Sequence, residues 1–127
     1  MKGVLLIVED ERDMQDLMKR YIKKSGLDIE VYSAYNGREG ANKYKELMEK
    51  GKKPDLVIMD LKLPVMDGVE ATKKIKKIDR EAVIYGFTAF FKTEWAEKLI
   101  EAGAEKIIPR YMGFEGLIEE LTDYFKK

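Results

Sequence analysis

Acidic side chains follow two of the most apolar stretches of this 127-residue chain. Glu9 and Asp10 come directly after the apolar run 4–8, and Asp60 comes directly after the run 56–59. A short and continuously apolar run is typical of a strand that is buried on both faces of a parallel sheet. Because ligands bind beyond the carboxyl ends of such strands, we expect the three carboxylates to meet in one site.

Three converging carboxylates repel one another, and a hard divalent cation is the usual way to hold them ionised. We therefore expect Mg²⁺ here, or Mn²⁺ in its place. Its expected ligands are Asp10 and Asp60 directly, Glu9 through water, and the backbone carbonyl of Lys62. A metal would draw a phosphoryl group toward Asp60, and a carboxylate is an adequate nucleophile for phosphorus. The hydroxyl of Thr88, at the end of a later apolar run, is placed to donate to a phosphoryl oxygen.

Structural roles for the same residues remain open. Acids after a strand often only cap the next helix, which applies to Glu9, Asp10 and Glu11. A lone threonine such as Thr88 is more often a cap than a ligand. Asp60 is harder to explain in this way, because a carboxylate after a fully apolar strand is costly unless it is paired or bound to metal.

Composition excludes several classes of chemistry. The chain has no cysteine and no histidine, which removes disulfides, thiol nucleophiles, zinc–thiolate sites and imidazole bases. Its 24 basic residues balance its 24 acidic ones, so we expect no direct DNA binding.

No apolar run approaches the roughly 20 residues that cross a bilayer, and no signal peptide is evident, so we expect a cytoplasmic protein away from membranes. The length predicts one domain over residues 1–127, without an output domain.

Hydrophobic periodicity predicts the elements that position these residues. Strands are expected at 4–8, 29–32, 56–59, 82–87 and 107–108, the last cut off by Pro109. Amphipathic helices are expected from Asp13 to Gly26, around 41–48, from an Asp67 cap to Ile78, from a Thr93 cap to Gly103, and over 114–125. This alternation predicts an α/β fold, a (βα)5 doubly wound parallel five-stranded sheet of order 2-1-3-4-5, as in flavodoxin-like proteins.

Two of these helices have specific faces that we expect to be buried. The first should bury a stripe formed by Met14, Leu17, Met18, Tyr21 and Ile22. The fourth should turn inward Trp95, Ala96, Leu99 and Ile100.

Four motifs, at 5–11, 55–68, 86–89 and 102–104, make the chain resemble the receiver domains of two-component response regulators, in their stand-alone CheY-like form. The resemblance covers essentially the whole chain. It implies that Asp60 accepts a phosphoryl group from the phosphohistidine of a partner histidine kinase or phosphotransfer protein, with Mg²⁺ held around Glu9, Asp10 and Asp60. The lack of histidine agrees, because the donor is then another molecule.

The position of the family's phosphoryl-contacting lysine, which usually precedes a proline with a cis bond, falls here on Arg110 and is followed by Tyr111. Arg110 supplies the charge, although its planar head is not interchangeable with an ammonium. Lys106 also carries a positive charge, but it lies at the start of the fifth predicted strand, away from the expected site at the carboxyl ends. Without proline a cis bond costs about 3 kcal/mol, so we expect a trans bond between Arg110 and Tyr111.

A second departure concerns the aromatic residue that receivers commonly carry on strand five as part of their switch. Ile107 holds that position, and we expect it to be ordinary core. The substitute candidates are Tyr85, Phe90, Phe91 and Tyr111, among which the sequence does not choose.

Three functions are compatible with this pattern. The first is a phosphorylatable switch, not an enzyme, that binds a downstream protein through helix four, strand five and helix five. The second is a pseudo-receiver, an interaction module in which Asp60 is phosphorylated poorly or never, as Arg110 and Ile107 suggest. The third is a Mg²⁺-dependent phosphatase with Asp60 as nucleophile, disfavoured because no second acid is spaced to protonate a leaving group.

Overall fold

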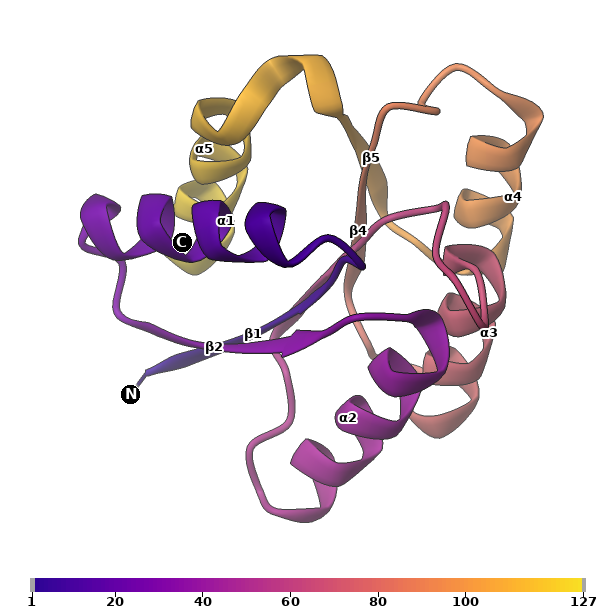
Figure 1. Ribbon diagram of the computed structural model, residues 1–127. Coiled ribbons are helices and arrows are strands. Elements are labelled where there is room, and N and C mark those ends of the chain that lie inside the picture. Colours follow the sequence, from indigo (N-terminus) through magenta and orange to yellow (C-terminus); the bar gives the residue numbers. More distant parts are fainter. Residues whose placement is uncertain (1, 127) are drawn as a thin grey trace.

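The computed structural model describes residues 2–126, which form a five-stranded parallel sheet flanked by helices (Figure 1). The strands are β1 (Gly3–Val8), β2 (Ile29–Ala34), β3 (Leu56–Met59), β4 (Ile84–Thr88) and β5 (Lys106–Pro109). They lie in the order β2-β1-β3-β4-β5, and each neighbouring pair is parallel. The predicted fold class and strand order are therefore confirmed.

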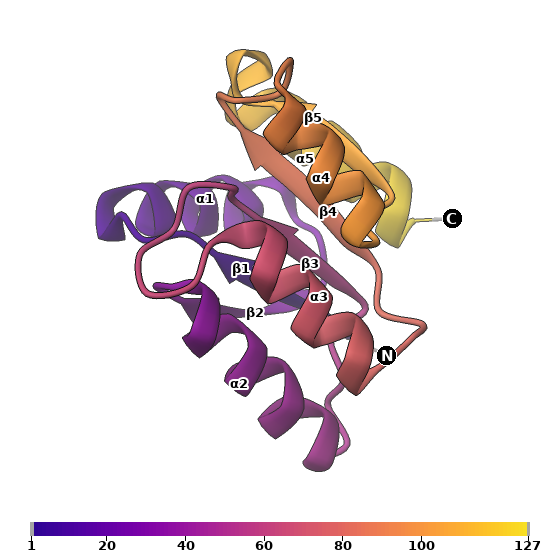
Figure 2. The same cartoon turned by 90° about the vertical axis from the view of Figure 1, so that its right-hand side faces the viewer.

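Helices cover both faces of the sheet. They are α1 (Arg12–Ser25), α2 (Gly37–Glu49), α3 (Gly68–Ile78), α4 (Glu94–Ala102) and α5 (Gly113–Phe125), and the short 3₁₀ helix η1 (Arg110–Met112) joins β5 to α5. On one face α1 packs against α5, and on the other α3 lies between α2 and α4 (Figures 1 and 2). Within residues 2–126 the structure has no helix that is both long and apolar enough to pass through a bilayer.

The central strands feed two cores because strand side chains alternate between faces. In β1, Leu5 and Ile7 join the cluster under α1 and α5, whereas Leu6 and Val8 join the cluster under α2, α3 and α4. All four side chains are almost fully buried. This two-sided burial explains why the runs that form β1 and β3 contain no polar residue before their terminal acids.

Polar caps begin three of the helices. The side chain of Asn36 accepts the Glu39 N–H at the start of α2, Asp67 accepts the Glu70 N–H at the start of α3, and Thr93 accepts the Ala96 N–H at the start of α4. At the other end of α1, Gly26 adopts the left-handed conformation with φ 78°. The predicted caps at Asp67 and Thr93 and the predicted stop at Gly26 are confirmed.

Several predicted boundaries shift by a few residues. The second strand continues to Ala34, and β4 begins at Ile84 and continues to Thr88. Pro109 is the last residue of β5, which also gains Lys106 at its start. An edge strand tolerates a terminal proline because the missing N–H is not needed for the ladder.

Two predicted buried faces were partly wrong. The buried residues of α1 are Gln15, Met18 and Ile22, whereas Leu17 and Tyr21 are exposed. The buried side of α1 therefore includes the Gln15 amide, which donates to backbone carbonyls of the sheet. Ile100 is 44% exposed, because the nine-residue α4 buries only Ala96 and Leu99 against the edge of the sheet.

The loop between β3 and α3 contains a strained residue. Val65 has φ 67° and is the one non-glycine residue with positive φ between residues 2 and 126. A β-branched residue in this region is a genuine outlier, and the side chain is 68% exposed, so little packing compensates the strain. The loop is tight because the Gly68 N–H donates back to the Leu61 carbonyl at 2.8 Å.

Val65→Asn should therefore stabilise the protein by about 1 kcal/mol, because asparagine tolerates the left-handed conformation. Urea unfolding at neutral pH measures the change. Val65→Ala is the matched control, since it removes the same exposed methyl groups but keeps a residue that disfavours positive φ. Equal midpoints for the asparagine and alanine variants would show that backbone strain at Val65 does not limit stability.

Candidate functional site

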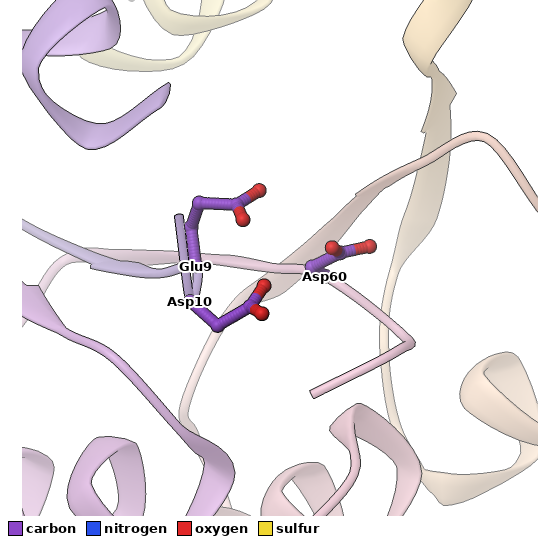
Figure 3. Close-up of side chains that lie close together, drawn as sticks. All are labelled: Glu9, Asp10 and Asp60. Atoms are coloured by element: carbon purple, nitrogen blue, oxygen red, sulfur yellow. The ribbon is translucent and has the colours of Figure 1, made fainter. Parts of the chain in front are cut away.

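Three carboxylates converge at the carboxyl edge of the sheet. Glu9 and Asp10 follow β1, and Asp60 follows β3, its neighbour in the sheet. One carboxylate oxygen from each residue lies within 4.8 Å of the other two. Figure 3 shows Glu9 and Asp10 extending from the same turn toward Asp60. The expectation that these side chains meet is confirmed.

The three acids differ in exposure. Glu9 is only 2% exposed, Asp60 is partly buried and Asp10 is open to solvent. Asp10 and Asp60 line a cleft of about 540 Å³, together with Glu11, Lys62, Leu63, Pro64, Ala89, Phe90 and Arg110. Two carboxylates that line an open cleft, with the buried Glu9 carboxylate beside them, suit the oxygen-preferring chemistry of Mg²⁺ and Mn²⁺.

Both oxygens of Glu9 have partners. The Glu11 N–H donates to Oε2 at 3.0 Å, and Nη2 of Arg110 donates to Oε1 at 2.9 Å. Burial raises the pKa of the Glu9 carboxyl, and the nearby charge of Asp60 adds to this, while the Glu11 N–H and Arg110 act in the opposite direction. Glu11, at the start of α1, makes no capping hydrogen bond through its side chain. The Glu11 side chain therefore does not act as a helix cap.

Asp60 is held by its own backbone neighbour and faces the same guanidinium. The Leu61 N–H donates to Oδ1 at 2.8 Å, and Nη2 of Arg110 lies 3.6 Å from Oδ2. Burial raises the pKa of the Asp60 carboxyl despite opposition from Arg110, the Leu61 N–H and the Thr88 hydroxyl. Asp60 is thus a desolvated carboxylate with one oxygen directed at a cation.

Arg110 reaches the site from η1. Besides Glu9, its Nη2 donates to the Phe87 carbonyl at 3.0 Å, and the guanidinium carbon lies 4.4 Å from the centre of the Phe87 ring. No cis peptide bond occurs within residues 2–126, so the predicted trans bond between Arg110 and Tyr111 is confirmed. Lys106, at the opposite end of β5, pairs with Glu120 at 2.9 Å.

Thr88 and Lys62 complete the predicted set. Thr88 is fully buried at the end of β4, where its Oγ1 accepts the Phe90 N–H at 3.1 Å. Lys62 lines the cleft, and its ammonium lies 6.0 Å from the centre of the Phe90 ring. The roles of the Thr88 hydroxyl and the Lys62 carbonyl stay predictions.

The aromatic candidates for a switch fall in different places. Phe91 packs edge-on against Tyr111, with ring centres 5.2 Å apart, and Tyr111 is 76% exposed. Phe90 packs against Trp95, while Tyr85 is buried on the other side of the sheet beside Tyr124. Ile107 packs against the core under α2, α3 and α4, as expected.

Gln15 is absent from the predicted site residues, although its amide reaches the backbone of Glu9. Its side chain is fully buried, and Nε2 lies 3.2 Å from the Glu9 carbonyl oxygen. The available signal is its spacing of three and seven residues from Met18 and Ile22, which places a polar residue on the buried face of α1. No sequence pattern predicts the ion pair between Glu9 and Arg110, because the two residues are far apart in the chain.

Asp60→Asn should stabilise the metal-free protein by about 0.5–2 kcal/mol at neutral pH, because it removes a buried charge and leaves Glu9 paired with Arg110. The pKa of Asp60 is raised on folding, so the folded protein holds this proton more tightly than the unfolded chain. Wild-type stability should therefore fall as pH rises from the ordinary aspartate range through the folded pKa, and the advantage of the variant should grow over that window.

Urea unfolding in a chelator from acid to neutral pH tests this expectation. Asp67→Asn is the matched control, since Asp67 is only partly buried, lies outside the acidic cluster and can be replaced by asparagine as a helix cap. A variant that is less stable than wild type at neutral pH would mean that the Asp60 charge is fully compensated.

Comparisons with known proteins agree with this fold and site. The model of the response regulator receiver domain matches residues 5–122. Chemotaxis protein CheY of Thermotoga maritima is 37% identical over 122 residues, which cover 96% of this chain and 97% of the relative. The response regulator domain of CheB from the same organism has a TM-score of 0.82 at 25% identity, covering 99% of this chain and 95% of that chain. The receiver domain of a sensor histidine kinase from Pseudomonas aeruginosa, solved with a magnesium ion in its active site cleft, has a TM-score of 0.83 at 22% identity and covers 100% of both chains. The chain described here belongs to the response regulator receiver domain family.

Proposed function

We propose that this protein is a phosphorylatable switch of a two-component phosphorelay, in which Asp60 accepts a phosphoryl group from the phosphohistidine of a partner kinase or phosphotransfer protein. The observation that carries the proposal is the position of Asp60, opposite Glu9 and Asp10 in an open cleft and 3.6 Å from the Arg110 guanidinium. A carboxylate oxygen of Asp60 attacks phosphorus, the bond from phosphorus to the donor nitrogen breaks, and the electron pair remains on the imidazole.

Arg110 and Thr88 are suited to hold the phosphoryl group. Phosphorylation adds close to two negative charges, and a guanidinium binds phosphate oxygens through charge-assisted hydrogen bonds. Arg110 already points at Asp60 and needs only a small movement to follow that charge. The Thr88 oxygen accepts the Phe90 N–H, so its own proton is available for a phosphoryl oxygen.

Mg²⁺, or Mn²⁺ in its place, fits the acidic cluster. We assign Asp10 and Asp60 as direct ligands, Glu9 as a ligand through water, and the Lys62 carbonyl as a further ligand on the cleft wall. When bound, the cation neutralises charge that develops on the phosphoryl oxygens during transfer. The magnesium ion in the Pseudomonas aeruginosa receiver supports this choice of metal.

The output is a changed binding surface for a downstream protein at α4, β5 and α5. Thr88 links the site to this region, because its oxygen holds the Phe90 N–H in the loop that leads to α4. Phe91, in the same loop, packs against Tyr111, and Tyr111 presents most of its surface to solvent. The protein would act as a signalling domain in the cytoplasm, and it would bind neither DNA nor membranes. Besides accepting a phosphoryl group, it would catalyse only the hydrolysis of its own acyl phosphate.

A pseudo-receiver is the rival function. It is favoured by the ion pair at 2.9 Å between Arg110 and Glu9, which places a positive charge against a carboxylate that we assign to the metal site. Ile107, in place of an aromatic switch residue, points in the same direction.

Incubation with acetyl phosphate and Mg²⁺ should add one phosphoryl group, detected by intact-protein mass spectrometry, and Asp60→Asn should abolish the addition. Asp67→Asn, outside the acidic cluster, is the matched control and should be phosphorylated like wild type. No uptake at saturating donor and metal would favour the pseudo-receiver, and sustained turnover of an external phosphomonoester would favour the phosphatase.

Arg110→Ala should have two opposite effects. Mg²⁺ should bind more tightly, because the variant removes the cation that competes for Glu9 and Asp60. Phosphorylation by acetyl phosphate should slow by at least about tenfold at saturating Mg²⁺, because a positive charge at the phosphoryl group is lost. Titration calorimetry and the rate of mass gain measure the two effects.

Lys106→Ala is the matched control for Arg110→Ala, since it removes a β5 cation that pairs on the surface with Glu120. It should change neither quantity. If Arg110→Ala is phosphorylated as fast as wild type, Arg110 is not the cation that holds the phosphoryl group.

A further inference from the structure

The side chain of Gln15 joins α1 to the ends of two strands. Its Nε2 lies 3.0 Å from the Ile7 carbonyl oxygen, 3.2 Å from that of Glu9 and 3.0 Å from that of Ala34. The Glu9 N–H donates to the same Ala34 oxygen at 3.0 Å, one residue after Val8, which pairs with Ala34 at the end of β1 and β2. The amide of Gln15 therefore fastens the backbone where β1 ends and the acidic turn begins.

The orientation of this amide is determined by its surroundings. Turning it over would place Oε1 against the three carbonyl oxygens, all of which are acceptors. As it stands, Oε1 is buried without a hydrogen-bond partner among residues 2–126. An unpaired buried oxygen costs stability, and that cost offsets part of what the Nε2 hydrogen bonds contribute. The net gain in fold stability is therefore reduced, whereas the position of the amide against the turn that carries Glu9 and Asp10 is specific.

We propose that Gln15 is a positioning residue for the divalent metal, and that its amide holds the backbone of Glu9 so that Glu9 and Asp10 face Asp60. This inference rests on the metal-dependent function proposed above. The Glu9 carboxylate accepts the Glu11 N–H of the same turn, so its position depends on the backbone that Gln15 contacts. Asp10 is exposed and comes one residue later, so the direction of its side chain depends on the same turn.

Metal affinity separates this role from a purely structural one. The Kd for Mn²⁺ is measured on the full chain by titration calorimetry for wild type, Gln15→Met and Tyr124→Phe, and urea midpoints are recorded for all three. Tyr124→Phe is the matched control, because the Tyr124 hydroxyl donates to the Asp55 carbonyl at 2.7 Å, just before β3 and at the opposite edge of the sheet. Both variants thus remove side-chain donors to backbone carbonyls, but only Gln15→Met does so beside the acids.

Gln15→Met should raise the Kd for Mn²⁺ by about 10–100-fold, the usual effect of losing a group that orients metal ligands. Tyr124→Phe should leave the Kd within about twofold of wild type, because its site is distant. A Kd for Gln15→Met within about twofold of wild type would overturn the inference, whatever the change in urea midpoint. If Gln15→Met does not fold, Gln15→Leu is measured in the same way, with the same two outcomes.

The wild-type titration distinguishes failure of this inference from failure of the proposed function. If wild type binds Mn²⁺ and Gln15→Met binds it equally well, only the role of Gln15 is wrong. If wild type binds no more Mn²⁺ than Asp60→Asn, the metal site itself is wrong, and the inference falls with it.

Discussion

One guanidinium offsets two desolvated carboxylates where β1 and β3 lie side by side, and the rest of the site depends on this balance. Arg110 contacts Glu9 at 2.9 Å and Asp60 at 3.6 Å, yet burial still keeps the pKa of both acids raised. The site is therefore compensated only in part, and it retains affinity for further positive charge. The divalent cation that we propose supplies this positive charge, and the phosphoryl group that we propose on Asp60 adds negative charge again.

Unfavourable features collect at this edge of the sheet. Val65 has a strained backbone in the loop after β3, the Gln15 oxygen is buried without a partner, and the acids themselves are desolvated. The opposite edge has well-matched contacts, such as the hydrogen bond from Tyr44 to Asp79 and that from Tyr124 to Asp55. Strain and unsatisfied polar groups tend to persist where function requires them, so this asymmetry independently supports the proposal that the functional site lies at the carboxyl edge.

The sheet order and the meeting of the acids could be predicted because they follow from pattern and topology. Apolar runs that alternate with helical stripes imply parallel strands with right-handed crossovers, and the doubly wound order 2-1-3-4-5 then places β1 beside β3. Glu9, Asp10 and Asp60 come directly after those strands, so their proximity needs no knowledge of side-chain packing. The caps at Asp67 and Thr93 were predictable for a similar reason, since they depend on local chemistry.

Features that depend on long-range packing could not be predicted. Periodicity in α1 indicates an apolar face but not its rotation, and the buried face includes Gln15, whose amide binds carbonyls of two strands. The contact between Arg110 and Glu9 depends on how η1 directs a long side chain back over Phe87. Ile100 is apolar, but the short α4 covers too little of the sheet edge to bury it.

The most direct test of the central claim identifies which of the three converging acids carries the phosphoryl group. The protein is phosphorylated with acetyl phosphate and Mg²⁺, the acyl phosphate is reduced with borohydride to the corresponding alcohol, and peptides are mapped by mass spectrometry. We predict homoserine at residue 60 alone. Reduction at Glu9 or Asp10, or at no residue under conditions that saturate donor and metal, would contradict the assignment of Asp60 as the phosphoacceptor.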